Sequence, residues 1–296
     1  MKRNHVGLLG ATSLVGSCIL QQLVTEQWQI TAFSRKPMES NREQINWVQL
    51  NQAGAKPVQN KYGPALWICV APIWTLPEHF SLLLTHGAQR IVILSSTSRF
   101  SKTASSDSGE QAIAQRLADA EETIEIWAKE HDIEWIILRP TLIYGLGSDK
   151  NISEMARFII RFGFFPLLGP ADGLRQPIHA KDVATACILA LNTLNIKNRT
   201  YNLTGGETLT YQEMINRIFS ALNKKPRFIR IPRWLFQLTI SVLNWLPRYR
   251  HWTAAMAERM NRNLVFDSIN LQQDLRFQPG SFILSKADLP LEQNRI

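Results

Sequence analysis

The feature that most constrains this chain is residues 5–20, HVGLLGATSLVGSCIL. A short apolar run leads there into a turn of small residues between Gly10 and Gly16, and then into a helical pattern. Such a turn lets a phosphate approach the backbone, and the helix N-terminus offers N–H groups and the positive end of its dipole. We therefore expect a site for the pyrophosphate of a dinucleotide. Because Ser13 stands where a middle glycine is expected, an ordinary strand-to-helix turn remains the alternative.

Strand-length apolar runs alternate with helical segments up to about residue 140. Residues 65–71, ALWICVA, form a continuous apolar run, which is typical of a parallel strand covered on both faces. This alternation predicts an α/β fold with a Rossmann-like, doubly wound parallel sheet. The expected strands are 29–33, 45–50, 65–71, 90–94 and 134–138, the expected helices are 14–26, 76–85 and 110–131, and residues 99–109 are expected to lack regular structure.

Length and composition suit one compact unit made of two interleaved parts. The 296 residues, 45% hydrophobic, predict a dinucleotide-binding domain over 1–150 and a smaller, mainly helical substrate lobe over 151–296. Three scattered cysteines argue against a disulfide framework or a structural metal site, and they favour a cytoplasmic location. We read the N-terminus as a first strand and not as a signal peptide. No apolar window is long enough to span a membrane.

The charge of the chain is uneven. The first 150 residues are balanced, so the whole net charge of +9 lies in the second part. This excess suggests an anionic partner, and a solvated basic face is the alternative. Residues 224–262 hold nine basic residues and one acid around an apolar helical pattern at 232–246. That helix could contact a membrane surface or a hydrophobic substrate, although burial against the domain is the preferred interpretation. We expect no nucleic-acid partner, because no recognition module is present.

The end of the second expected strand bears on the choice of cofactor. An acidic residue there accepts the ribose 2′-hydroxyl of NAD, whereas an arginine accommodates the 2′-phosphate of NADP. This strand is followed by Ser34, Arg35 and Lys36, and so by two cations in place of an acid. We therefore predict NADP(H) in preference to NAD(H), with Arg35 as the first contact. The alternative is that both cations are solvated loop residues.

A cluster of hydroxyl groups, Ser95 to Ser98, follows the strand expected at 90–94. Ligands bind at the carboxyl ends of strands in an open sheet, so these hydroxyl groups could hold a substrate oxygen. They could equally close the end of the strand as turns.

Four stretches resemble the short-chain dehydrogenase/reductase superfamily, in its extended and atypical branch, the NAD-dependent epimerase/dehydratase family. They occur in the family's order. They are the GATSLVG turn, the strand end at 95–97, the segment 138–145 with Arg139, Pro140 and Tyr144, and residues 178–184, IHAKDVA; residues 201–210 also look like the family's stretch before a C-terminal helix.

This resemblance implies roles for individual residues. Gly10, Ser13 and Gly16 would line the pyrophosphate, Thr97 would hydrogen-bond the reacting oxygen, and Pro140 would begin the segment beside the nicotinamide. Arg175 resembles the arginine that nucleotide-sugar enzymes direct to substrate phosphates, and a loop charge is the alternative. His179 and Asp182 are expected to fix a turn. The cofactor-binding candidates are Gly10, Thr12, Ser13, Leu14, Val15, Gly16, Ser34, Arg35, Lys36, Asn51, Ala71 and Pro140.

The chain departs from the family at the reaction itself. The family's Tyr-x-x-x-Lys places a proton donor and the lysine that lowers its pKa on one helical face. Aligning Ala120 and Glu121 with the usual Ala-Glu after this motif puts Ile113 and Leu117 at the two positions. Neither side chain can transfer a proton, and the sequence contains no Tyr-x-x-x-Lys. Lys102 and the nearby hydroxyl groups could substitute, although no spacing requires it.

Two functions therefore stay open. The first is an NADP-preferring oxidoreductase or nucleotide-sugar epimerase/dehydratase acting on a small substrate, with Thr97 holding the reacting oxygen. An anionic or nucleotide-linked substrate would suit the basic second half of the chain. The second is a catalytically silent cofactor-binding regulator or an assembly subunit, such as the accessory subunit of respiratory complex I that this family includes. The sequence leaves the substrate and the oligomeric state open.

Overall fold

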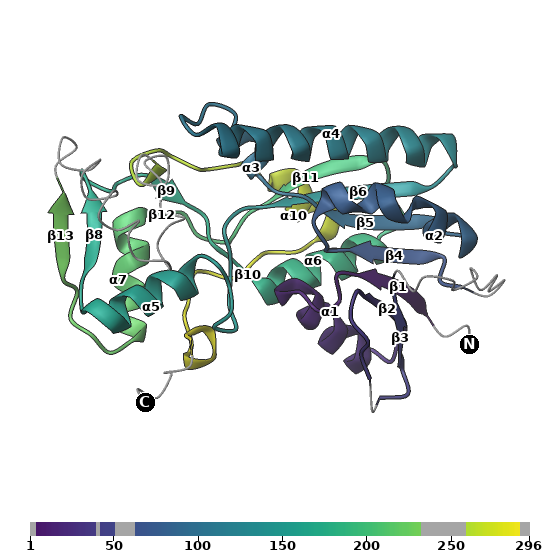
Figure 1. Cartoon of the computed structure of the whole chain (residues 1–296), viewed down its shortest axis with the longest axis horizontal. Helices are drawn as coiled ribbons and strands as arrows, with labels where there is room; N and C mark the ends of the chain where they lie inside the picture. The colour runs from purple at the N-terminus through teal and green to yellow at the C-terminus, as the bar shows by residue number, and fades with distance from the viewer. Residues whose placement is uncertain (1–3, 40–41, 51–62, 232–258, 291–296) are drawn as a thin grey trace.

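The computed structural model describes residues 4–39, 42–50, 63–231 and 259–290 (Figure 1). Its centre is a seven-stranded sheet in the order β11-β6-β5-β4-β1-β2-β3, and every neighbouring pair runs parallel. The chain order reverses between β1 and β4, which is where ligands bind in open α/β sheets. The strands are β1 (His5–Leu9), β2 (Gln29–Ser34), β3 (Ile45–Gln49), β4 (Leu66–Cys69), β5 (Arg90–Leu94), β6 (Glu134–Pro140) and β11 (Arg199–Leu203).

Helices cover both faces of this sheet, as Figure 1 shows. On one face, α1 (Leu14–Thr25) and α6 (Ala180–Asn192) lie side by side over a core that includes Leu8. On the other face, the 3₁₀ helix η1 (Ile73–His79), α2 (Phe80–Thr85) and α4 (Ser108–Glu130) enclose a second core that includes Leu9. Successive β1 side chains thus enter opposite cores, as the pleat of a strand requires. The predicted doubly wound α/β fold is confirmed.

The second half of the chain completes this sheet. The edge strand β11 pairs with β6, and α10 (Ile269–Leu275) packs beside it. The Tyr201 hydroxyl donates a hydrogen bond to Asp274 Oδ2 at 2.6 Å, which ties α10 to the strand. Residues beyond 150 therefore contribute a strand and two helices to the large lobe.

A smaller lobe, on the left of Figure 1, has its own core. It contains α5 (Ile152–Phe162), α7 (Tyr211–Ala221) and the parallel pair β8 (Phe165–Leu168) and β13 (Phe228–Ile231). Two short strand pairs are β7 (Ile143–Tyr144) with β10 (Ile178–His179) and β9 (Leu174–Arg175) with β12 (Leu209–Thr210), and the second of them packs against α7. The helix expected at 232–246 lies outside the described residues.

Two local predictions were wrong. The helix expected at 76–85 begins earlier, as η1, and becomes α-helical only at Phe80, because Pro77 lacks an N–H group to continue an α-helix. A short helix, α3 (Ser98–Ser101), occupies part of the run expected to be irregular. Arg139 lies over the Phe100 ring there, a contact with a distant strand that local sequence does not show. No helix in the described part of the chain is long and apolar enough to cross a membrane.

Candidate functional site

In the turn after β1, the backbone of Gly10 lies close to that of Ala71 and to the start of α1. Gly10 has φ +84°, and a Cβ atom added to it would lie 2.4 Å from the backbone nitrogen of Ala71. A Cβ atom on Gly16 would lie 2.2 Å from the carbonyl oxygen of Gly10. Both positions therefore require glycine, the first for its positive φ and the second for the contact between helix and turn. A cradle with this little bulk fits a pyrophosphate.

Ser13 caps α1 where the family pattern would place a glycine. The Ser13 Oγ atom accepts a hydrogen bond from the Gly16 N–H at 3.0 Å, and the Ser13 N–H donates to the Gly10 carbonyl at 3.0 Å. The Ser13 hydroxyl hydrogen is still able to donate to an anion. Among the neighbouring candidates Thr12 is exposed, Leu14 is half-buried and Val15 is buried. The first turn of α1 carries no acidic residue that would oppose a phosphate.

The end of β2 lies beside this turn, because Leu9 and Phe33 are partners in the parallel register. Arg35 and Lys36 follow the strand directly, and both are exposed. Ser34 is buried, and its Oγ atom accepts a hydrogen bond from the Lys36 N–H at 3.2 Å, which shapes the bend. The two cations therefore follow the carboxyl end of β2, and their contact with a ribose phosphate stays a prediction. Asn51, one of the cofactor-binding candidates, lies outside the described residues.

Thr97 and Pro140, from the ends of β5 and β6, lie together. The Thr97 hydroxyl and the Thr97 N–H each donate to the Pro140 carbonyl at 3.1 Å. Thr97 is buried, with 6% of its surface exposed. The hydroxyl hydrogen is engaged with the backbone, while the oxygen lone pairs remain able to accept a hydrogen bond. The arrangement brings together two residues that the sequence predicted for one site, and their roles stay predictions.

The face of α4 that carries Ile113 and Leu117 is apolar. Leu117 is 4% exposed and lies in the core shared by η1, α2 and the sheet, and Ile113 packs against the same core. Trp74 of η1 belongs to that core as well, and Arg116 lies 4.5 Å from its ring. These two positions of α4 therefore present hydrocarbon, and their match to the family's tyrosine and lysine stays a prediction from the sequence.

Glu121, one turn further along α4, is buried and multiply paired. It accepts hydrogen bonds from Arg139 Nη2 at 2.5 Å, from Ser95 Oγ at 2.5 Å and from Arg99. Burial by itself would raise the pKa of Glu121, but the hydrogen bonds from Arg139 and Ser95 hold it below its ordinary value. This group joins α4 to the ends of β5 and β6. The sequence analysis aligned Glu121 with the family but did not predict its partners. An acidic residue on an otherwise apolar helix face was the signal that it would be buried and paired.

Arg175 is buried beneath the small lobe. Its Nη1 atom donates to the carbonyls of Leu174 at 2.7 Å and Arg262 at 2.8 Å, its Nη2 atom donates to the carbonyl of Arg259, and its guanidinium lies over the Tyr211 ring. Burial lowers the pKa of Arg175 to about 10. The guanidinium thus holds residues 259–262 in place. Its proposed contact with substrate phosphate stays a prediction, and that contact would have to share these donors.

His179 and its neighbours join the start of α6 to residues 285–288. The Lys181 N–H donates to His179 Nδ1 at 3.0 Å, so His179 caps α6, and its Nε2 atom lies 3.0 Å from Asp288 Oδ1. Burial would raise the pKa of Asp288, but hydrogen bonds from Ser285 and His179 lower it to about 2. Tyr144 packs edge-on against His179, and burial raises the pKa of Tyr144 to about 12. These side chains fix a turn, as expected for His179.

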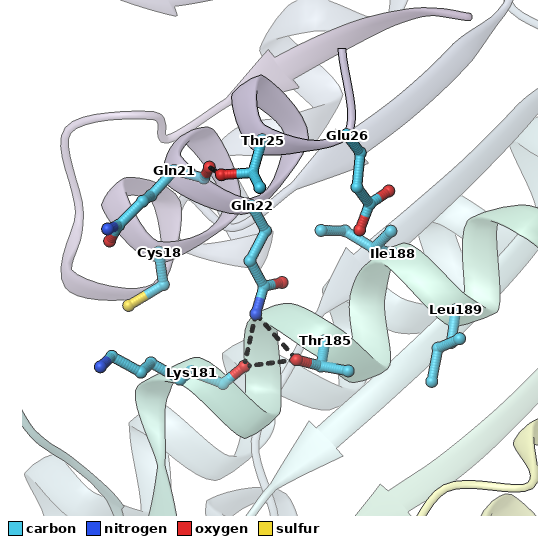
Figure 2. Close-up of a pocket in the computed structure, with 9 residues that line it drawn as sticks. All are labelled: Cys18, Gln21, Gln22, Thr25, Glu26, Lys181, Thr185, Ile188 and Leu189. Atoms are coloured by element: carbon cyan, nitrogen blue, oxygen red, sulfur yellow. Dashed lines mark hydrogen bonds between the residues drawn. The ribbon is translucent and has the colours of Figure 1, made fainter. Parts of the chain in front are cut away.

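A groove of about 400 Å³ lies between α1 and α6 (Figure 2). Gln22 Nε2 crosses it to donate to Thr185 Oγ1 at 2.8 Å. Cys18 faces the same groove, and burial raises the pKa of its thiol, so the thiol is a poor nucleophile there. The groove begins past the Gly10–Gly16 turn and runs along the sides of the helices. We assign it no part in the dinucleotide site.

Comparisons with known proteins agree with this geometry. Residues 80–204 match the model of the NAD dependent epimerase/dehydratase family. A stretch of 100 residues is 29% identical to the Arabidopsis thaliana mitochondrial protein named NADH dehydrogenase [ubiquinone] 1 alpha subcomplex subunit 9, covering 33% of this chain and 25% of that protein. Another of 137 residues is 21% identical to the Vibrio cholerae UDP-glucose 4-epimerase, covering 46% and 42%. The chain thus matches less than half the length of either relative.

Among solved structures, the fold is shared with a Bacillus cereus UDP-glucuronic acid 4-epimerase in complex with UDP-glucuronic acid and NAD. The TM-score is 0.71 at 12% sequence identity, and the match covers 96% of each chain. An identity this low shows the fold alone. Residues 80–204 thus resemble the NAD dependent epimerase/dehydratase family, and the fold of the whole chain is shared with UDP-sugar epimerases of known structure.

Proposed function

We propose that the protein binds a nicotinamide dinucleotide, NADP(H) in preference to NAD(H), and uses it in a sensing or assembly role without tyrosine-assisted hydride transfer. One observation carries this proposal: the close backbone contacts of Gly10 and Gly16 coexist with hydrocarbon at Ile113 and Leu117. A pyrophosphate requires the close backbone approach that the two glycines allow. The hydrocarbon at Ile113 and Leu117 leaves the protein without the paired acid and base. The Arabidopsis relative, named as a subunit of NADH dehydrogenase, favours an assembly role.

In this proposal each group of residues has a binding task. Backbone N–H groups at the start of α1, with the Ser13 hydroxyl, hold the pyrophosphate. Arg35, with Lys36 beside it, pairs with the ribose 2′-phosphate, and Pro140 lies beside the nicotinamide. When bound, the nicotinamide would be able to exchange a hydride with a partner molecule. Ile113 and Leu117 exclude water beside α4 and supply no proton to that exchange.

A second function has its own support. Thr97 presents acceptor lone pairs at the ends of β5 and β6, where the family holds the reacting oxygen, and the structural neighbours bind nucleotide sugars. An oxidoreductase or epimerase acting on a small anionic or nucleotide-linked substrate would use this hydroxyl, with water in place of the tyrosine. Removal of a tuned acid or base lowers rates by about a hundred- to ten-thousand-fold, so such an enzyme would be slow.

The decisive experiment separates binding from turnover. NADPH and NADH are titrated into the purified protein while cofactor fluorescence is followed, and oxidation of each is then monitored with carbonyl compounds and UDP-sugars. We expect micromolar NADPH binding, weaker NADH binding and no turnover above the rate without protein. Turnover that is lost in Thr97→Val would establish the second function. Failure of both cofactors to bind at millimolar concentration would overturn both proposals.

A further inference from the structure

Strand β13 forms the outer edge of the small lobe. Figure 1 shows it at the left end of the molecule, with β8 on its inner side. The two strands are paired along the whole of β13, from Phe228 opposite Phe165 to Ile231 opposite Leu168. Among the described residues, no strand pairs with the other side of β13. An edge of this kind presents backbone N–H and C=O groups to which another extended segment can bind.

The register of the pair determines which residues of β13 direct their backbone groups outward. The Phe165 N–H donates to the Arg227 carbonyl at 2.9 Å, so the carbonyl of Arg227 faces β8. In a parallel pair, the residues of each strand alternate between those that bond to the neighbouring strand and those that face away from it. The N–H and C=O groups of Phe228 and Arg230 therefore face the outer side. An extended segment that lies along β13 would bind these groups and become a third strand.

This edge is also strongly basic. Of the eight residues 224–231, four are cations and none is an acid. All four cations are exposed; they are Lys224, Lys225, Arg227 and Arg230. Arg230 Nη2 donates to Gln212 Oε1 at 3.4 Å, and none of the four cations forms an ion pair with a described residue. Part of the positive charge of the second half of the chain is thus gathered at an open strand edge.

The side chains of β13 differ between its two faces. The Phe228 ring lies edge-on to the Phe219 ring of α7, with 5.7 Å between the ring centres. Arg230 reaches Gln212 near the start of the same helix, so this face of the strand is turned to α7. Ile229 points the opposite way, as the pleat requires, and is 49% exposed. A partner strand would therefore lie beside cations and one exposed apolar side chain.

The charge of the edge selects among the partners that it could take. In a pair formed with the β13 strand of a second copy, cations of the two strands would face one another, which is destabilising. An anionic membrane would attract the cations, but stable membrane contact also needs buried apolar area, and Ile229 is a single apolar side chain. An acidic extended segment complements both the outward backbone groups and the cations.

We propose that β13 is a docking edge for an acidic, extended segment of a partner protein, which adds to β13 as a third strand. Backbone hydrogen bonds to Phe228 and Arg230 fix the segment, and its carboxylates pair with the exposed cations of residues 224–230. The docking edge uses none of the residues assigned to the dinucleotide. It therefore stands whether or not a cofactor binds.

Fluorescence anisotropy with labelled peptides tests the proposal on the whole protein. The probe is a fluorescein-labelled peptide of about six residues, the usual length of a strand, that alternates glutamate with valine. We expect it to bind at low salt. A peptide with lysine in place of glutamate should bind at least about tenfold more weakly, because it loses the charge-assisted hydrogen bonds. Equal binding of the two peptides would overturn the preference for an acidic partner.

A modified peptide separates strand addition from attraction between charges. N-methylation of the backbone amides keeps every glutamate but removes the N–H donors that a third strand needs. It should weaken binding about tenfold, as loss of backbone hydrogen bonds predicts. If the methylated and unmethylated peptides bound equally, charge alone would account for binding, and addition as a third strand would be overturned.

Variants of the protein locate the site. Arg227→Glu combined with Arg230→Glu should weaken binding of the glutamate peptide at least about tenfold. The matched control combines Lys129→Glu with Lys286→Glu, which makes the same change of charge on exposed residues of α4 and of η4 (Lys286–Asp288). The control should change the affinity less than about twofold, because exposed charges at a distance are screened by salt. Equal losses in the two variants would overturn the site on β13.

Two further measurements complete the test. Circular dichroism melting shows whether each variant is folded, and the comparison of peptides on the unaltered protein decides the proposal even if a variant is not. Sedimentation with vesicles of phosphatidylcholine and phosphatidylserine tests the membrane as a rival partner. Binding to these vesicles without binding to the glutamate peptide would overturn the docking edge for a protein segment.

Discussion

The turn between Gly10 and Gly16 and the first half of α4 lie at the same edge of one sheet, and they differ in what they offer a cofactor. The turn consists of backbone held so closely that a Cβ atom at Gly16 would meet the Gly10 carbonyl at 2.2 Å. The α4 face offers side chains, and at Ile113 and Leu117 these are hydrocarbon packed into a core. One region is closely packed backbone, while the other is hydrocarbon that carries no acid or base at these two positions.

This difference shows that binding and chemistry depend on separable properties of the fold. A pyrophosphate site needs backbone N–H groups and close approach, which glycine and the strand-to-helix geometry provide. Acid–base chemistry needs particular side chains at particular positions. α4 still carries a buried ionised group at Glu121, but that carboxylate is saturated by arginines and a serine hydroxyl. It therefore anchors the helix and leaves the apolar face unchanged.

The largest effect is expected from Glu121→Gln. Breaking a buried ion pair leaves the guanidinium of Arg139 without its partner, which costs about 3–5 kcal/mol of unfolding free energy. Glu122→Gln, on the exposed side of the same helix, should change it by less than ~0.5 kcal/mol. Urea unfolding monitored by circular dichroism measures both. A loss below 1 kcal/mol in Glu121→Gln would mean that the anchor does not hold α4.

The same carboxylate also gives a pH dependence with a definite sign. The pKa of Glu121 in the folded protein lies below its ordinary value of 4.5, so its stabilisation is complete above that value and is lost as the pH falls through the folded pKa. Unfolding free energy measured from pH 7 to pH 3 should therefore fall more steeply in the unaltered protein than in Glu121→Gln. Parallel curves would contradict this assignment.

Leu117→Lys tests the apolar face directly. An ammonium group at a site that is 4% exposed must be desolvated or neutralised, so we expect a loss of about 3 kcal/mol. Leu117→Met keeps the volume and should cost less than about 1.5 kcal/mol. Thermal melting with and without NADPH measures the change. If Leu117→Lys were as stable as Leu117→Met, the position would be open to a cofactor, and the contrast between the two regions would fail.

Gly16→Ala tests the turn. Its Cβ atom would clash with backbone, which costs about 1–3 kcal/mol and displaces the helix N-terminus from the pyrophosphate. We expect NADPH affinity to fall at least tenfold in fluorescence titrations. Gly87→Ala is the control, because Gly87 has φ +67°, so an alanine there is strained, but no atom lies within 4 Å of an added Cβ. Equal losses of affinity in the two variants would show that general strain, and not the cradle, is responsible.

The smallest effect is expected from Arg35→Ala, because the side chain is exposed. Loss of a charge-assisted contact with the 2′-phosphate should weaken NADPH binding by about five- to tenfold and leave NADH binding nearly unchanged. Arg42→Ala, a neighbouring exposed arginine after β2, provides the comparison for a general loss of charge. Equal weakening of both cofactors by Arg35→Ala would remove the basis for the NADP preference.

Much of the fold followed from periodicity alone. The alternation of apolar runs predicted the strands of the sheet up to residue 138, and their ends agree with the structure to within a few residues. Predictions from local sequence were less accurate where an element depends on contacts with residues far along the chain. The irregular run after Thr97 contains α3, which packs against Arg139 of another strand, and η1 replaces the first part of an expected helix at Pro77.

In the candidate site, too, some features could be predicted from the sequence and others could not. Gly10, Gly16 and the hydrocarbon at Ile113 and Leu117 could be read from the sequence, because backbone freedom and side-chain polarity are properties of single residues and their spacing. The partners of Arg175 and Glu110 could not be read, because each contacts residues far along the chain. Nothing in the sequence near Arg175 indicates that its guanidinium serves the carbonyls of residues 259–262.

The sequence by itself therefore determined the class of fold, the glycine turn after β1 and the absence of a Tyr-x-x-x-Lys motif. Tertiary structure alone decided that β11 completes the sheet, that Arg175 and Glu121 are buried among fixed partners, and that Glu110 pairs with an arginine 149 residues away. The physical reason is the sequence separation over which each effect acts. Periodicity and backbone freedom act over a few residues, whereas burial and ion pairing are set by which segments meet when the chain closes on itself.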